Sequence, residues 1–141
     1  MPSTDGPSKV PPDDLAAGLA ARTFNPCVGS ILVSETSTNR IWTIHLKPGE
    51  RLPFHRHVLN YFWTAVTAGR AVSHINGGEP TANDYQAGDP KHLSFRSGEF
   101  MSHDLENIGD TDLMTVEFLN SENPSLPLPK DVRRHRALQE G

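Results

Sequence analysis

Residues 49–69 read GERLPFHRHVLNYFWTAVTAG, and this stretch decides the fold that we expect. At its centre, His55 and His57 stand two positions apart. In a β-strand two such side chains point to the same face, whereas in a helix they diverge. Pro53 argues against a helix, and the residues after His57 are rich in β-branched and aromatic types that favour strands. Because imidazole binds Zn, Cu, Fe and Ni, the stretch predicts a metal site on a strand.

The glycines and histidines around this pair resemble the two cupin motifs. In the first motif a Gly, a His-x-His pair, a Glu and a second Gly recur at set intervals, and Gly49 and Gly69 stand at the glycine positions. Further along the chain, the second motif has its counterpart in a set of residues that resembles it: Gly88, Asp89, Gly98, His103 and Asn107. The resemblance covers about 60 residues in the middle of the chain. It implies an all-β protein, a single cupin barrel (jelly-roll, double-stranded β-helix) with short terminal helices.

The first motif lacks its usual carboxylate ligand. Counting back from Gly69 puts the position of the family's Glu on Phe62, and the neighbouring Tyr61 is no carboxylate either. The ligand set that the resemblance implies is therefore His55, His57 and His103.

The second motif also departs from the family pattern. Arg96 stands where a Pro is usual, and four residues separate Gly98 from His103. The loop before Gly98 is longer than usual and contains His92, which stays an alternative third ligand or a general base. Glu117 is a further candidate carboxylate, but its neighbours in the last strand are the better inward-facing residues.

Iron-dependent thiol and diketone dioxygenases among the cupins also use three His without the Glu. The resemblance implies a divalent transition metal, with Fe(II) favoured and Zn, Ni or Mn as alternatives. Three neutral imidazoles leave the ion its full charge and open positions, which favours a small anionic substrate. Arg51 or Arg96 is then a candidate partner for a substrate carboxylate. Tyr61 is a candidate hydrogen-bond or proton donor, although the expected register turns it outward.

Two other classes of function stay open. A cupin that binds a small molecule without catalysis is supported by the loss of the Glu. A metal-free epimerase or isomerase has the same barrel but needs a His and Tyr acid/base pair close together.

Length, charge and composition exclude several classes of protein. A chain of 141 residues predicts one domain and is too short for a (β/α)8 hydrolase, which needs about 250 residues. A net charge of -4 gives no electrostatic footprint for nucleic acid. No apolar run is long enough to span a membrane and no leader is evident, so we expect a cytoplasmic protein. Cys27 is the single cysteine, and we expect an inert, buried thiol.

The chain divides into an arm over residues 1–12, a barrel over 13–120, and a Pro-rich, basic tail over 121–141. We predict a short helix over 15–22. The strongest strand signals fall, in chain order, at 31–36, 40–46, 59–67, 70–75 and 113–119. Asn76-Gly77 after the fourth of these predicts a hairpin. His45 falls on the outer face of its strand.

The glycine count also predicts the register of residues 59–67. Phe62, Thr64 and Val66 are expected to face inward with the His pair, and Tyr61 and Trp63 to face outward. Two outward aromatic rings form an apolar patch that needs a cover. We therefore predict a homodimer that pairs through this face, with the N-terminal helix as the alternative cover.

Overall fold

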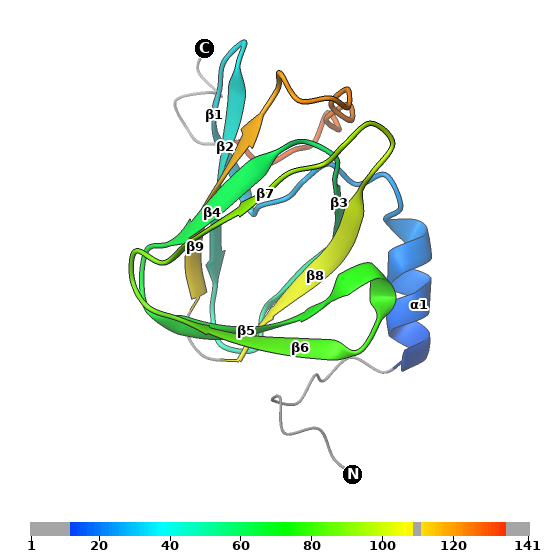
Figure 1. Ribbon diagram of the computed structural model, residues 1–141. Coiled ribbons are helices and arrows are strands. Elements are labelled where there is room, and N and C mark those ends of the chain that lie inside the picture. The colour runs from blue at the N-terminus through cyan, green and yellow to red at the C-terminus, as the bar shows by residue number, and fades with distance from the viewer. Residues whose placement is uncertain (1–11, 109–110, 135–141) are drawn as a thin grey trace.

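The computed structural model describes residues 12–108 and 111–134, which form two antiparallel sheets and one helix (Figure 1). The elements are α1 Pro12–Ala21, β1 Ile31–Glu35, β2 Asn39–Leu46, β3 Arg51–His57, β4 Tyr61–Ala65, β5 Gly69–His74, the 3-10 turn η1 Ile75–Gly77, β6 Pro80–Tyr85, β7 Pro90–Leu93, β8 Met101–Asn107 and β9 Thr111–Phe118. Strands dominate the described residues, and the one α-helix among them precedes all the strands. The all-β prediction is confirmed.

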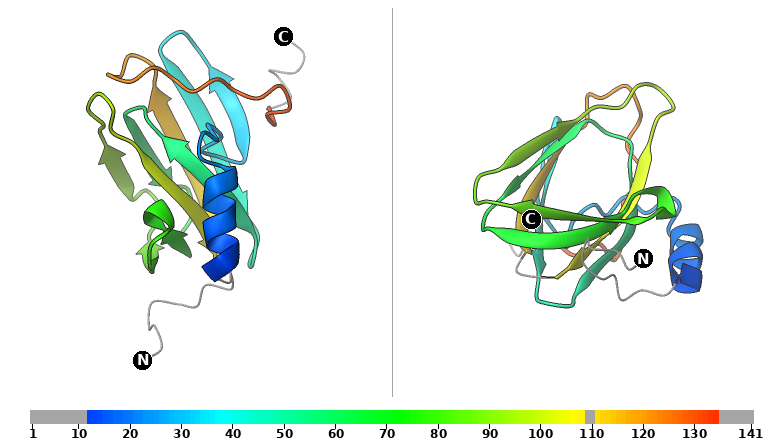
Figure 2. Two further views of the ribbon diagram at one scale, coloured as in Figure 1. Left: turned by 90° about the vertical axis from the view of Figure 1, so that its right-hand side faces the viewer. Right: turned by 60° about the horizontal axis from the view of Figure 1, so that its bottom comes forward.

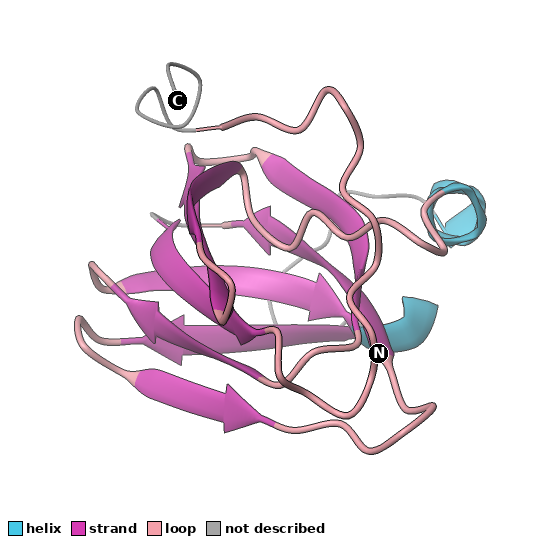
Figure 3. Ribbon diagram, turned by 90° about the horizontal axis from the view of Figure 1, so that it is seen from above, coloured by secondary structure: helices cyan, strands magenta, loops and turns pink. Residues whose placement is uncertain are grey.

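The two sheets face each other across one interior. Their strand orders are β1-β2-β9-β4-β7 and β3-β8-β5-β6. Figure 2 and Figure 3 show the strands wrapped around this interior, with α1 outside the barrel. Apolar side chains from both sheets pack between them: Ile44, Leu46, Leu52, Ala65, Ala71, Tyr85 and Leu113. Consecutive strands such as β3 and β4 therefore lie in different sheets, as a jelly-roll barrel requires.

The predicted hairpin at Asn76-Gly77 is confirmed. Asn76 and Gly77 have φ angles of 54° and 76°, a left-handed conformation that Gly and Asn tolerate best. The turn joins β5 to β6, which pair antiparallel from Gly69 opposite Tyr85 to His74 opposite Pro80. The same turn contacts α1, because the Leu19 side chain lies directly over Gly77.

The predicted helix over 15–22 is found as α1, which begins three residues earlier and ends one residue earlier. It packs on β3 through Gly18, where an added Cβ would lie 3.6 Å from the Phe54 ring. Of the predicted arm, residues 1–11 lie outside the described residues. No described helix is long and apolar enough to cross a membrane.

The described part of the predicted tail packs against the barrel. Leu128 and Val132 contact the buried side chains of Leu32 and Trp42. The amide of Leu32 donates a hydrogen bond of 2.8 Å to the carbonyl of Arg133. Residues 132–134 form no helix. The rest of the predicted tail, residues 135–141, lies outside the described residues.

The register predicted for residues 59–67 is wrong. Tyr61 is buried, and Trp63 packs against the core between the sheets. Phe62 points the other way, and Val66 is 58% exposed. The predicted faces depend on counting positions back from Gly69. However, β4 ends at Ala65, and Gly69 begins β5 in the opposite sheet. Alternation of faces does not continue through such a turn.

This correction removes the surface on which the homodimer prediction depended. The rings of Tyr61 and Trp63 lie inside the barrel, so they form no outward apolar patch. α1 covers a different surface, beside β3 and η1.

Candidate metal centre and cavity

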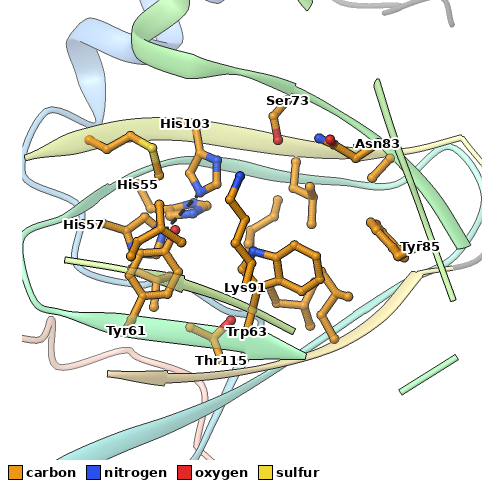
Figure 4. A pocket seen from close by; sticks show the side chains of 18 of the residues that line it. His55, His57, Tyr61, Trp63, Ser73, Asn83, Tyr85, Lys91, His103 and Thr115 are labelled. Atoms are coloured by element: carbon orange, nitrogen blue, oxygen red, sulfur yellow. Dashed lines mark hydrogen bonds between the residues drawn. The ribbon is translucent and has the colours of Figure 1, made fainter. Parts of the chain in front are cut away.

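Three histidines converge at one end of the barrel interior (Figure 4). His55 and His57 come from β3, and His103 comes from β8, where it lies directly opposite His55. Cross-strand neighbours share a face of the sheet, so all three imidazoles point inward. One nitrogen from each ring can be chosen so that all three lie within 4.8 Å of one another. The structure thus brings the three predicted ligands together.

The spacing of one pair of these nitrogens suits a shared metal ion. Nε2 of His57 and Nε2 of His103 are 3.1 Å apart. Two imidazole lone pairs at that distance repel unless a proton or a cation lies between them. Bonds of about 2.1 Å at tetrahedral or octahedral angles would place two such nitrogens about 3.0 to 3.4 Å apart. The observed distance falls inside that interval.

Burial keeps these imidazoles neutral. His55 is 1% exposed, and desolvation lowers its pKa to about 4 against weaker opposing effects of the Pro53 carbonyl and Asp104. Burial also lowers the pKa of His57 and His103 well below the usual value, and charge on their histidine neighbours lowers both further. The neutral imidazole is the form that binds a metal, so no proton needs to be removed near neutral pH.

Two contacts orient the rings. Nδ1 of His55 lies 2.9 Å from the carbonyl oxygen of Pro53, which can only accept, so Nδ1 carries the proton and donates. Its Nε2 is therefore left with a lone pair, as in metal sites where a backbone carbonyl orients the ligand. The His57 ring stacks on Tyr61 with a centroid distance of 4.0 Å and an angle of 12° between planes.

Tyr61, not Phe62, is the β4 residue beside the histidines. Phe62 contacts the rings of His92 and Phe118 on the outer face of the sheet. The phenol of Tyr61 therefore stands next to the site, and not the Phe62 ring that the glycine count predicts there. Burial raises the pKa of Tyr61, and the charge of Glu117 raises it further, so the phenol stays protonated. Neither residue supplies the family's carboxylate.

The histidines lie at the wall of a cavity of about 380 Å³. Aromatic and aliphatic side chains form much of its lining, and a few polar groups project into it (Figure 4). The side chains labelled there, besides the three histidines and Tyr61, are Trp63, Ser73, Asn83, Tyr85, Lys91 and Thr115. A cavity of this size and composition is typical of sites for small molecules.

Several other candidates from the sequence lie away from this cavity. Arg51 contacts the buried carboxylate of Asp104 at 2.8 Å, which occupies its guanidinium outside the cavity. Arg96 is exposed in the loop before β8, and His92 is exposed on the outer face of β7. His45 is exposed, as predicted, and pairs with Asp112. The structure gives none of these four a place in the cavity.

Sequence reasoning missed Lys91 and misplaced Glu117. Lys91 lies opposite Trp63 in the register of β4 and β7, so it shares the inner face with that ring. Glu117 lies opposite Tyr61 and is 3% exposed, whereas Val116 lies opposite the outward Phe62. Lys91 is the cross-strand neighbour of Trp63, and Glu117 is that of Tyr61. With the correct register for β4, both residues would therefore be predicted to face inward.

Glu117 makes the stability of the protein depend on pH. Trp42 Nε1 donates a hydrogen bond of 2.8 Å to its carboxylate. Burial nevertheless raises its pKa from 4.5 to about 7, against smaller lowering effects of Trp42 and Arg40. The folded state disfavours the charged form of Glu117. Below about pH 4.5 the acid is protonated in both the folded and the unfolded state, so it does not lower the free energy of unfolding. As the pH rises from about 4.5 to about 7, the free energy of unfolding falls.

We therefore expect Glu117→Gln, which keeps an oxygen for Trp42, to stabilise the protein only at higher pH. Relative to wild type, its free energy of unfolding should rise by roughly 2 kcal/mol between pH 5 and pH 8. Urea unfolding at both pH values measures this change. The exposed Glu79→Gln serves as the control and should show no such rise. An equal effect of Glu117→Gln at both pH values would contradict the prediction.

Comparison with known proteins supports the fold. Neither a protein-family model nor a curated protein matches the sequence. A cupin domain from Bordetella pertussis is 19% identical, with a TM-score of 0.53 over 67% of this chain and 95% of that chain. A cupin superfamily protein from Desulfitobacterium hafniense is 13% identical, with a TM-score of 0.49 over 84% and 98% of the two chains. A hydroquinone 1,2-dioxygenase solved with Fe3+ is 17% identical, with a TM-score of 0.45 over 68% and 28%.

The similarity to the Bordetella pertussis domain, together with the two facing sheets, establishes a cupin fold for this chain. The expectation from the two sequence motifs is confirmed at the level of the fold.

Proposed function

We propose that this protein is a metal-dependent enzyme in which His55, His57 and His103 bind one divalent transition ion. The observation that carries the proposal is the convergence of three neutral imidazoles on one point, those of His55 and His57 buried and that of His103 partly buried. Nitrogen ligands at about 2.0 to 2.2 Å are expected. We favour Fe(II), and Zn, Ni and Mn are the alternatives, since imidazole accepts all of these ions.

The reaction that the site supports best is dioxygenase-like oxidation of a small anionic metabolite. An Fe(II) ion would supply the redox chemistry and open coordination positions for it. The three histidines would hold that ion without adding negative charge. Tyr61, protonated and stacked on His57, is placed to donate a hydrogen bond to an oxygen of the substrate. The side chains of Trp63 and Tyr85 give this part of the cavity an apolar wall.

Metal analysis and oxygen uptake test this proposal. Protein purified without a His-tag should contain about one equivalent of a transition metal per chain, or bind one after treatment with a chelator and reconstitution. Reconstitution with Fe(II) should then support oxygen consumption with small carboxylates, and removal of the metal should abolish it. Failure to bind any of the four metals would overturn the proposal.

A metal-free isomerase is the second candidate, and one observation favours it. Such an enzyme needs a His and a Tyr close together, and the His57 and Tyr61 rings stack at 4.0 Å. An isomerase of this kind would keep its activity after treatment with a chelator, whereas the metal-dependent enzyme would lose it. A cupin that only binds its ligand would show neither activity.

A further inference from the structure

We propose that Lys91 selects an aromatic carboxylate for this cavity by pairing with the acid group of the ligand. The inference deepens the proposed function and rests on it, since the same acid group would also reach the ion held by the three histidines. It assigns the anion-binding role to a lysine that the sequence motifs did not indicate.

The fold directs Lys91 into the cavity. Trp63 lies opposite Lys91, and Tyr61 lies opposite Leu93, so the inner face of β7 continues the inner face of β4. Figure 4 shows the Lys91 side chain extending between the Trp63 ring and His103. An anion between the ammonium group and the histidines would therefore contact both.

Lys91 also has no competing partner in the described part of the chain. It forms no hydrogen bond or ion pair there, whereas Arg40, Arg51 and Arg70 each pair with a carboxylate. Lys91 is exposed, so its ammonium group stays available to a ligand. A cation that lines a cavity and lacks a partner within the protein is a natural partner for a ligand anion.

The acids that also line the cavity have partners of their own. Asp84 pairs with Arg70 at 3.0 Å, and its side chain is 75% exposed. The Asp89 carboxylate accepts a hydrogen bond of 2.8 Å from the amide of Gln86. Neither acid forms an ion pair with Lys91. These local contacts leave the charge of Lys91 for the ligand.

The cavity wall beside Lys91 suits a flat, apolar body. Trp63 and Tyr85 meet edge to face with their ring centroids 5.7 Å apart. Leu105 and Leu113 add aliphatic surface to the same lining. Aromatic rings pack well against such edge-to-face pairs, and the volume of about 380 Å³ accepts one or two fused rings. Together the cation and this wall match an aromatic acid.

Benzoate and its neutral isostere benzamide test the assignment. Their affinities would be measured by calorimetry on the full chain, reconstituted with Zn(II) as a redox-inert ion, with metal content determined on the same samples. Lys91→Met should weaken benzoate binding about tenfold and change benzamide binding by less than about twofold. Lys91→Arg should retain most of the preference for benzoate, and Lys47→Met, in the turn after β2, should behave as wild type.

The outcomes separate this inference from the proposed function. Unchanged benzoate affinity in Lys91→Met, with metal bound, would overturn the role of Lys91 and leave the metal site standing. Equal weakening of benzoate and benzamide would overturn it too, because loss of packing explains both. Wild-type protein that binds no benzoate would overturn the aromatic-acid class. Selective loss of benzoate binding in a chain that binds no metal would support Lys91 and overturn the metal proposal.

Discussion

Replacement of His57 by Ala should lower the affinity for the metal by at least roughly a hundredfold. His57 is 2% exposed and its Nε2 lies 3.1 Å from that of His103, so no neighbouring group can take its place. Loss of an orienting partner alone commonly costs 10- to 100-fold in metal affinity, and loss of a ligand costs more. Metal content after dialysis against a weak chelator measures the effect.

Two further variants distinguish the loss of a metal ligand from a failure of the His57→Ala variant to fold. His103→Ala removes a ligand at a less buried position and should cause a comparable loss of metal with a smaller loss of stability. His92→Ala removes an exposed histidine on the outer face and should leave metal content unchanged. If His57→Ala and His103→Ala both retained wild-type metal content, the assignment of the ligands would be wrong.

Installing the missing carboxylate at Tyr61 should reverse the preference of the site for anions. In Tyr61→Glu the new side chain starts beside His57, so it can cancel one charge of the ion and occupy one position. A like charge about 4 Å away costs between about 1 and 4 kcal/mol, depending on solvent access. We expect tighter metal binding and benzoate binding roughly a hundredfold weaker.

Phe62→Glu is the matched control for this variant. It places the same carboxylate one residue along β4, on the outer face with His92 and Phe118, and should leave benzoate affinity unchanged. Calorimetry on both variants with metal bound decides the register. A large loss of benzoate affinity in Phe62→Glu, with none in Tyr61→Glu, would show that β4 has the register that the glycine count predicts.

The elements of this fold could be predicted where the signal is local. The His-x-His pair needs only the alternation of a strand, and His55 and His57 indeed share one face. Asn76-Gly77 needs only the preference of these residues for left-handed backbone, and the hairpin lies there. His103 was placed by its position after Gly98, and β8 brings it opposite His55.

The errors lie where a prediction crossed a turn or a sheet. The faces of Phe62 and Trp63 were counted from Gly69, which belongs to another strand in the other sheet. The sequence predicts Arg51 as a candidate partner for a substrate carboxylate, but its guanidinium pairs with the buried carboxylate of Asp104 instead. The inward position of Lys91 could not be predicted from the sequence, because it depends on the pairing of β7 with β4 and not on the neighbouring residues in the chain.

The sequence by itself determined the class of fold, the turns and the three histidines that converge in the barrel. These depend on backbone preferences and on side-chain alternation within single strands, which are properties of short stretches of chain. Only the tertiary structure decided that Tyr61 rather than Phe62 stands beside His57, that Glu117 is buried and that Lys91 enters the cavity. Each of these depends on the register between strands of distant sequence, and burial of one face against the other sheet sets that register.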